Sequence, residues 1–442
     1  MTGMTPALPP YPAYKEAGLP WLPRIPEHWE VRRLKTLLRQ RSEKGYPEEP
    51  MLAATQTKGV VRKENYENRT VLALKDLHLL KLVKAGDFVI SLRSFQGGIE
   101  YAREQGIISP AYTILYPVDK RNHAYFAKLF KSKPFIENLN LYVTGIRQGQ
   151  NIDYVKLSRS DIPLPPPSEQ RAIADYLDRA DARIRRAIEL RQRQVELLEE
   201  YKRALIQQAV TGQIDVRTGE PYPAYKESGV PWLGRVPKHW EVSRIKHHTR
   251  ITRGKFAHRP RNDPSLYGGS YPFIQTGNVS RAKKFIDTYT QTLNKKGLAI
   301  SQMFPAGTLV MTIAANIGDV AILEFDACFP DSIVGFLPTS GIARDFLYYM
   351  FRVMHSEMLK EAPVNTQGNL NIERIGSMQI VVPPLSEQRA IARYLDEQAA
   401  KIDTAITAAR RSIELLREYR TRLIADVVTG QVDVREVGRV KG

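Results

Sequence analysis

Six loop segments of the sequence combine glycine with arginine, lysine or side-chain amides, and these residue types suit contacts to nucleic acid. Glycine lets a backbone approach a phosphate closely, and arginine, asparagine and glutamine match the paired donors and acceptors of base edges. Lysine and arginine also neutralise phosphates. The candidate contact residues are Lys58, Arg62, Lys63, Arg93, Ser94, Gln96, Arg147, Gln148, Asn151, Arg253, Lys255, Arg259, Arg261, Gln275, Thr276, Asn278, Thr366, Gln367 and Asn369. Each segment equally fits an ordinary turn, because glycine and asparagine are common turn residues.

Catalytic motifs are missing from the sequence. No Gly-x-Gly-x-x-Gly opens a helix and no Gly-x-x-x-x-Gly-Lys-Ser/Thr is present, so cofactor and ATP sites lack their backbone cradles. Leu8-Pro9-Pro10-Tyr11 is similar to the tetrapeptide of amino-methyltransferases, but Leu8 replaces the polar residue that holds the target amine. Pro330-Asp331 is not followed by the acidic-x-Lys strand of a nuclease. We therefore expect no catalytic residue, metal ligand or bound cofactor in this chain.

Composition indicates an ordinary globular protein with a strong positive charge. The 442 residues include 65 Lys and Arg against 47 Asp and Glu, a net charge of +18, and 43% are hydrophobic. This hydrophobic content excludes wholesale disorder, and the charge favours a polyanionic partner, either nucleic acid or an acidic membrane surface. Cys328 is the single cysteine, which excludes an internal disulfide and a cysteine-based zinc site.

The sequence predicts neither a signal peptide nor a membrane span. Its first residues lack a basic start followed by an apolar core. The longest uncharged stretch, 297–318, contains Pro305, Gly307 and Asn316, which is typical of buried strands and turns. We expect a cytoplasmic protein with no membrane partner.

The chain is a tandem repeat whose two copies agree at their flanks. YPAYKEAGLPWL at 11–22 returns as YPAYKESGVPWL at 222–233, and PPPSEQRAIADYLD at 165–178 returns as PPLSEQRAIARYLD at 383–396. The interiors between these blocks barely align. Duplication followed by divergence of the interior alone predicts one shared framework that carries two different recognition domains.

A long helix is predicted after each proline run. Ser168 and Ser386 are the predicted N-caps, and Gly212 and Gly430 the predicted C-terminal caps. Apolar residues at alternating steps of four and three give a coiled-coil pattern. The predicted seam contains Ile184, Ile188, Val195, Leu198 and Leu205 in the first helix, and Ile402, Ile406, Ile413, Leu416 and Leu423 in the second.

A stripe this narrow needs a partner helix. Ordinary core packing or a homodimer zipper would also bury it, but two copies on one chain favour intramolecular pairing because their effective concentration is high. The expected fold is therefore α+β, with two tandem α/β target recognition domains separated by a long antiparallel intramolecular coiled coil of pseudo-two-fold symmetry.

These patterns divide the chain into seven segments. The interiors carry strand patterns at 86–92, 112–118, 307–314 and 378–383, and helical patterns at 123–139 and 342–359. The predicted segments are an N-terminal framework segment (1–23), recognition domain 1 (24–167), a central spacer helix (168–213), a linker with the repeated framework segment (214–234), recognition domain 2 (235–385), a C-terminal spacer helix (386–431) and a tail (432–442).

The positive charge lies in the interiors. Recognition domain 1 carries 24 basic and 15 acidic residues, and recognition domain 2 carries 18 and 11. Each helix is nearly neutral, with nine basic and eight acidic residues in 168–209 and eight and seven in 386–427. Phosphate-neutralising charge confined to two duplicated domains favours nucleic-acid binding by those domains, with the helices as a solvated spacer.

The duplicated blocks, together with I/V-P-x-H-W-E-V and V-T-G-Q in both copies, resemble the specificity (S) subunits of type I restriction–modification systems. The resemblance covers 11–433. Three interior segments are also similar to that family's target recognition domains: 92–98, 275–278 and 311–319. The last of these adds Thr312 and Asn316 to the candidate DNA-contacting residues.

The resemblance implies a non-catalytic subunit that recognises a bipartite site in double-stranded DNA. Each domain would recognise one half-site, while the paired helices set the spacer and dock two methyltransferase (M) subunits. Restriction (R) subunits would join for cleavage, with S-adenosylmethionine, ATP and magnesium bound by these partners. The alternatives are a self-contained DNA methyltransferase or endonuclease, which the missing motifs disfavour, and a two-headed DNA-binding repressor.

Overall fold

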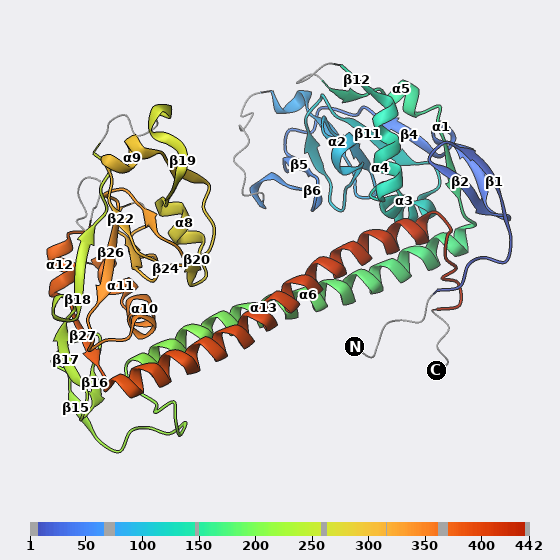
Figure 1. The fold of residues 1–442 in the computed structure, drawn as a ribbon. Coiled ribbons are helices and arrows are strands. Elements are labelled where there is room, and N and C mark those ends of the chain that lie inside the picture. The colour runs from blue at the N-terminus through green and yellow to red at the C-terminus, as the bar shows by residue number, and fades with distance from the viewer. Residues whose placement is uncertain are drawn as a thin grey trace. The chain divides into compact units, whose positions relative to one another are not determined.

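The computed structural model describes residues 8–65, 76–145, 150–257, 263–314, 316–360 and 370–437. The chain folds as two compact units (Figure 1). Unit 1 comprises residues 1–192 and 410–442, and unit 2 comprises residues 193–409. Each unit therefore contains one variable interior and one half of each long helix.

The interior of unit 1 is built on a four-stranded sheet in the order β4-β11-β8-β9. These strands are β4 (Leu38–Arg41), β11 (Thr113–Pro117), β8 (Phe88–Ile90) and β9 (Glu100–Tyr101), and every neighbouring pair is antiparallel. A hairpin of β5 (Leu52–Thr55) and β6 (Gly59–Arg62) and a pair of β7 (Lys81–Val83) and β10 (Gly106–Ile108) lie outside this sheet. The short helices are α2 (Ser94–Gly97), α3 (His123–Leu129) and α4 (Lys133–Leu139).

Unit 2 repeats this plan with a larger sheet in the order β18-β26-β23-β24-β20. Its strands are β18 (Thr249–Arg253), β26 (Ile333–Pro338), β23 (Leu309–Thr312), β24 (Val320–Leu323) and β20 (Phe285–Ile286). A second sheet has the order β21-β19-β25-β22, with β21 (Gln291–Leu293), β19 (Tyr267–Phe273), β25 (Ala327–Cys328) and β22 (Met303–Phe304). The helices of this interior include α8 (Thr276–Arg281), α10 (Arg344–Val353) and α11 (His355–Lys360).

The strand and helix patterns of the interiors are confirmed. The predicted strands contain β8, β11, β23 and β27 (Gln379–Val382). The predicted helical segment 123–139 contains α3 and α4, and the segment 342–359 contains α10 and all of α11 except Lys360. Both interiors are mixed, because half-buried β-branched runs alternate with segments whose apolar residues recur at helical spacing.

The two long helices, α6 (Pro167–Val210) and α13 (Leu385–Val428), each contain 44 residues. Their predicted N-caps are wrong by two positions. The amides of Glu169 and Gln170 both donate to the carbonyl of Pro166 at 2.9 Å, so the helix starts before Ser168. The same pattern, with Pro384 as acceptor, places Ser386 inside the first turn of α13. The first residue of α6 is Pro167, whose fixed φ suits the first turn, where amides need no intrahelical partner. The first residue of α13 is Leu385, and Pro384 directly precedes it.

Glycine ends both helices as predicted. Gly212 has φ +75° and Gly430 has φ +72°. In each case the amide of the following glutamine donates to a carbonyl five residues earlier at 2.8 Å, which closes a Schellman motif. A Cβ at Gly212 would lie 2.4 Å from the ring of Pro237, so close packing also requires glycine there.

The predicted antiparallel pairing of the helices is confirmed within each unit. In unit 1 the start of α6 lies beside the end of α13, and Asp181 pairs with Arg420 (Figure 1). In unit 2 the end of α6 lies beside the start of α13, and Lys202 donates to both carboxylate oxygens of Asp403 at 2.7 and 2.8 Å. The seam residues Ile184, Leu205, Ile402, Ile406, Ile413 and Leu423 are buried, and Ile188, Val195, Leu198 and Leu416 are half-buried.

Each end of the helix pair continues into the core of one interior. In unit 1, Ile173, Leu177 and Val427 belong to the same buried cluster as Trp29 and Phe126. The corresponding cluster of unit 2 joins the end of α6 and the start of α13 to Trp240 and the strands. The helices are therefore part of both cores, which ties the framework to the interiors.

A buried glutamate anchors the framework in both units. In unit 2, Glu387 accepts hydrogen bonds from Tyr222 Oη at 3.1 Å, Trp240 Nε1 at 3.0 Å and His239 Nε2 at 2.9 Å. Burial opposes the charge of Glu387, but these three hydrogen bonds outweigh it and hold its pKa below the ordinary value. The histidine of the repeated block therefore packs within the frame.

Unit 1 repeats this arrangement with the equivalent residues. Glu169 accepts from Tyr11 Oη, from Trp29 Nε1 at 2.9 Å and from His28 Nε2 at 2.7 Å. Burial and the hydrogen bond to the carboxylate raise the pKa of Tyr11 well above its ordinary value. The two frames are thus equivalent to the level of single hydrogen bonds.

Candidate nucleic-acid interface

In unit 1 the turn between β5 and β6 and the helix α2 bring candidate residues together. The turn is closed by Thr55, whose hydroxyl accepts from the amide of Lys58 at 3.0 Å and donates to the carbonyl of Gly59 at 2.9 Å. On the turn, Gln56 Nε2 donates to Gln96 Oε1 of α2 at 3.4 Å. A Cβ at Gly97 would lie 2.8 Å from Cγ of Gln56, so glycine permits this approach.

Lys131 contacts both the β5–β6 turn and α2. Its ammonium donates to the carbonyl of Gln56 at 2.9 Å, to the carbonyl of Gly97 at 2.6 Å and to Glu100 Oε1 at 2.7 Å. Glu100 is only 2% exposed, and burial raises its pKa to about 7 although Lys131 acts in the opposite direction. Close packing requires glycine at position 98, because a Cβ there would lie 2.2 Å from the carbonyl oxygen of Phe130.

In unit 2 the start of α8 presents the corresponding surface. The amide of Gln275 donates to Asn278 Oδ1 at 2.9 Å, which fixes the backbone at the helix start. The side chain of Gln275 donates through Nε2 to Gln291 Oε1 of β21. Asn316 donates through Nδ2 to Ser280 Oγ of α8 at 2.8 Å, which holds the loop after β23 against this helix.

Two of the predicted DNA contacts have buried side chains. Ser94 is 1% exposed, and its hydroxyl accepts from the amide of Ser91 at 2.8 Å. Thr312 is fully buried, and its hydroxyl donates to the carbonyl of Asn316. Both hydroxyls are engaged in hydrogen bonds within their own loops.

The other candidates differ in exposure and in the contacts that they make. The side chains of Lys58, Arg93, Gln96, Lys255 and Gln275 are exposed, and those of Asn151, Thr276 and Asn278 are half-buried. Arg62 and Arg253 are exposed but engaged, by Glu104 Oε2 at 2.7 Å and the carbonyl of Asp331 at 2.7 Å. Lys63 lies in the 3₁₀ turn after β6. The candidates outside the described residues are Arg147, Gln148, Arg259, Arg261, Thr366, Gln367 and Asn369.

Three residues at these loops are not among the candidates predicted from the sequence: Gln56, Gln291 and Lys131. A signal for Gln56 was present, because Gln56-Thr57 in the first interior matches Gln275-Thr276 in the second. Nothing in the sequence indicates that Gln291 or Lys131 lies beside these loops, since each comes from a distant segment.

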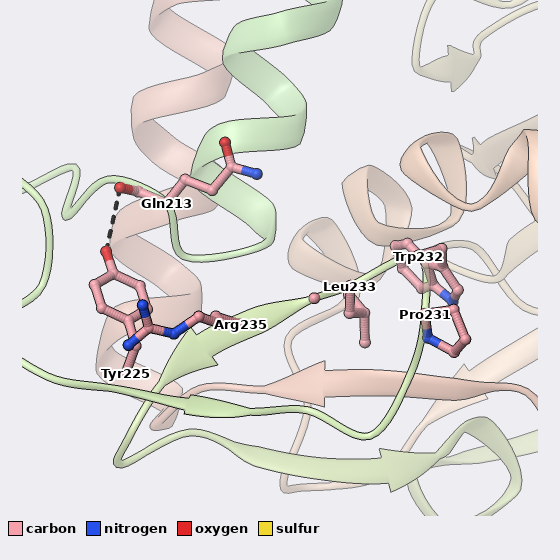
Figure 2. A pocket seen from close by; sticks show the side chains of 7 residues that line it. Gln213, Tyr225, Pro231, Trp232, Leu233 and Arg235 are labelled. Atoms are coloured by element: carbon pink, nitrogen blue, oxygen red, sulfur yellow. Dashed lines mark hydrogen bonds between the residues drawn. The ribbon is translucent and has the colours of Figure 1, made fainter.

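One pocket of unit 2 lies in the repeated framework and not on the interior loops. It is lined by Gln213, Tyr225 and the segment 231–235. Figure 2 shows Tyr225, whose hydroxyl donates to the carbonyl of Gln213 at 3.3 Å, together with Arg235, while Trp232 and Pro231 lie further along the segment. The guanidinium of Arg235 lies 5.7 Å from the ring centroid of Tyr225. These polar contacts hold the frame together.

Metal clusters and membrane-spanning helices are both absent from the described ranges. In them, no group of three or more His, Cys, Asp or Glu side chains could hold a metal ion. Of the helices within those ranges, none combines the length and the apolar character that crossing a membrane requires.

The family model of the type I restriction modification DNA specificity domain matches the chain twice, at residues 26–197 and 237–415. The chain belongs to this family. The MjaVIII specificity subunit of Methanocaldococcus jannaschii, a type I restriction enzyme subunit, is 22% identical over 436 residues, covering 94% of this chain and 95% of the relative.

Solved structures agree in fold. The HsdS subunit from Thermoanaerobacter tengcongensis superposes with a TM-score of 0.58 at 16% identity, covering 92% of this chain and 98% of that chain. A chain from a study of complex assembly and conformational transition in the type I R-M system gives a TM-score of 0.70 at 17% identity, covering 92% and 99%. This specificity subunit is the DNA sequence-recognition component of a type I system and not its catalyst.

Proposed function

We propose that the two units recognise the two halves of one interrupted site in double-stranded DNA. The observation that carries this proposal is the contrast between the frames and the interiors. The frames match hydrogen bond for hydrogen bond at Glu169 and Glu387, whereas the interiors differ in sheet size and in loop sequence. Identical frames with unlike loops suit a protein that presents two different binding surfaces in the same way.

Charge supports the same assignment. The excess of basic residues lies in the interiors, where lysines and arginines can neutralise phosphates. Side-chain amides in the same loops can contact base edges and so provide sequence specificity. The helices carry almost no net charge and extend over about 66 Å each at 1.5 Å per residue. We assign them the role of fixing the spacer between the half-sites.

Each helix also carries an exposed apolar pair that suits a partner subunit. Leu197 and Tyr201 of α6 are 48% and 55% exposed, and the equivalent Leu415 and Tyr419 of α13 are 46% and 42% exposed. Residues four apart share one helix face, so each pair forms a small apolar patch. We assign one methyltransferase subunit to each pair, with restriction subunits joining that complex. S-adenosylmethionine, ATP and magnesium would be bound by those partners.

The recognition role is tested by co-expressing the chain with its methyltransferase partner and mapping methylated adenines in the genome. A single interrupted motif is expected. Exchange of residues 24–167 for those of another family member should change one half-site only, and removal of one helical turn from α6 should change the spacer only. A change in both half-sites after the exchange would contradict the assignment, as would an unchanged spacer after the deletion.

The docking assignment is tested by native mass spectrometry of the complex. Leu197→Lys with Tyr201→Lys should reduce the bound methyltransferase subunits from two to one, and adding the equivalent changes at Leu415 and Tyr419 should leave none. Arg203→Glu, which changes an exposed side chain on another face of the same helix, is the control. Retention of both subunits by the fourfold variant would disprove docking at these pairs.

A further inference from the structure

The two unlike interiors share one element, a Gln-Thr dipeptide whose glutamine is exposed in both units. Gln56-Thr57 follows β5 directly, and Gln275-Thr276 follows β19 after one residue. In both units this strand runs parallel to the short strand that precedes the second strand of the main sheet, β11 in unit 1 and β26 in unit 2. Met51, next to β5, bridges Ile107 of β10 in parallel, and Phe273 of β19 pairs with Cys328 of β25 in parallel. The dipeptides therefore occupy equivalent places in the two folds.

The pockets beside the dipeptides support this equivalence. In unit 1, Gln56 and Thr57 line a pocket with Pro110, which lies between β10 and β11. In unit 2, Gln275 and Thr276 line a pocket with Pro330, which lies between β25 and β26. Each dipeptide thus faces the same connection of the fold across an open hollow.

In both units a second glutamine fixes the first. Gln56 Nε2 donates to Gln96 Oε1, and Gln275 Nε2 donates to Gln291 Oε1. A side-chain amide has two N–H donors and one acceptor oxygen. The contact between the glutamines uses one N–H of Gln56 and one of Gln275. The side-chain oxygen of Gln275 also accepts from the amide of Asn278 in the capping box of α8, which uses one of its two lone pairs. Each side chain therefore keeps one N–H donor beside an oxygen that can accept a further hydrogen bond.

One donor beside one acceptor is the complement of adenine in the major groove. Adenine presents the N7 acceptor next to the N6 amino donor, whereas guanine presents two acceptors and cytosine a donor only. A phosphate would use only the N–H and would face the amide oxygen with a negative charge. The geometry points to adenine: we propose that Gln56 and Gln275 each bind one adenine, in the first and second half-site respectively. This inference rests on the proposed function.

The backbone of each glutamine is held independently of its side chain. Lys131 binds the carbonyl of Gln56 at 2.9 Å, and Asn278 Oδ1 accepts from the amide of Gln275 at 2.9 Å. Such support lowers the entropy that the loop loses on binding. Both glutamines are therefore preorganised for a two-bond contact.

The test uses the complex of the full chain with its methyltransferase subunits and the interrupted duplex found by methylation mapping. Each adenine of a half-site is replaced in turn by 7-deazaadenine, which lacks the N7 acceptor, and affinity is measured by competition. For the native complex, one replacement in each half-site should weaken binding roughly 5- to 150-fold, the range for one buried donor left without its acceptor. Gln56→Ala should abolish this sensitivity in the first half-site only, and Gln275→Ala in the second only.

Control variants and a change of specificity complete the test. Gln105→Ala removes an exposed amide of unit 1, which donates to Glu49 Oε1 at 2.6 Å. Gln379→Ala removes an exposed amide of unit 2, on β27. Both control variants should keep the native sensitivity to 7-deazaadenine. Gln56→Glu, which preserves side-chain size, should shift the preference at the same position toward cytosine, because a carboxylate accepts from cytosine N4.

The outcomes separate the two proposals. A native complex without preference for any interrupted duplex would overturn the proposed function. A native complex that has this preference, with Gln56→Ala and Gln275→Ala variants that keep full sensitivity to 7-deazaadenine, would overturn the adenine assignment alone. If Gln56→Ala fails to fold, Gln56→Glu is measured in its place. An unchanged preference for adenine in that variant would also overturn the adenine assignment.

Discussion

Replacement of Glu387 by alanine should unfold the frame of unit 2 selectively. The carboxylate is 8% exposed and holds the ring donors of Trp240 and Tyr222 at 3.0 and 3.1 Å, besides His239. Its removal leaves two buried neutral donors unpaired, at about 1–3 kcal/mol each. We expect a loss of about 3–5 kcal/mol, a large part of the typical stability of a folded unit.

Hydrogen exchange measured by mass spectrometry on the full chain localises this effect. Peptides covering 213–245 and 385–396 should lose protection, while the equivalent peptides of unit 1 keep theirs. Glu169→Ala should produce the mirror pattern in unit 1, and Glu397→Ala, a change on the solvent-facing side of α13, should alter neither. A loss below about 1 kcal/mol at Glu387 would refute the view that this carboxylate is the anchor of the frame.

The pH dependence of the same frame has a definite sign. The pKa of Glu387 is lower in the folded state than its ordinary value, because hydrogen bonds from Trp240, His239 and Tyr222 outweigh the effect of burial. Its contribution to stability is therefore complete above the unfolded pKa and is lost as pH falls through the folded pKa. Low pH should therefore destabilise this frame in the native protein. Glu387→Gln should reduce the pH dependence of its stability.

Three further outcomes are expected. Gly98→Ala should destabilise unit 1 severely in urea unfolding, because its φ is +82° and the new Cβ would lie 2.2 Å from the Phe130 carbonyl. Unchanged stability would contradict this close approach of Gly98 to the end of α3. Burial raises the pKa of Glu100 in the folded state to about 7. The contribution of Glu100 to stability therefore falls as pH rises from the unfolded pKa through 7, and Glu100→Gln should remove this pH dependence from the thermal melts. A double-mutant cycle on Lys202 and Asp403 should give only about 0.2–1 kcal/mol, since both side chains are partly exposed; coupling of several kcal/mol would disagree.

The helices and the duplicated frame could be predicted from the sequence because their signals are local or repeated. Apolar residues at steps of four and three predict a paired helix whatever surrounds it, and Gly212 and Gly430 end the helices because glycine adopts positive φ readily. The starts were less predictable. Ser168 is a good N-cap by type, but the proline run before it begins the helix earlier.

The candidate interface was predictable only in part, for a physical reason. Residue type and glycine spacing identified Gln96 and Gln275, since exposed polar loops are visible in the sequence. Burial is a property of the whole fold, so Ser94 and Thr312 could not be separated from their exposed neighbours.

The sequence by itself determined the two-copy framework, the helix pair and the location of the positive charge, because each depends on repetition, periodicity or composition. Only the tertiary structure decided which loops meet. Gln56 lies 40 residues before Gln96, and Gln275 lies 16 before Gln291. Their contact depends on strand register and on the support of Lys131, which are set by packing between segments that no local pattern connects.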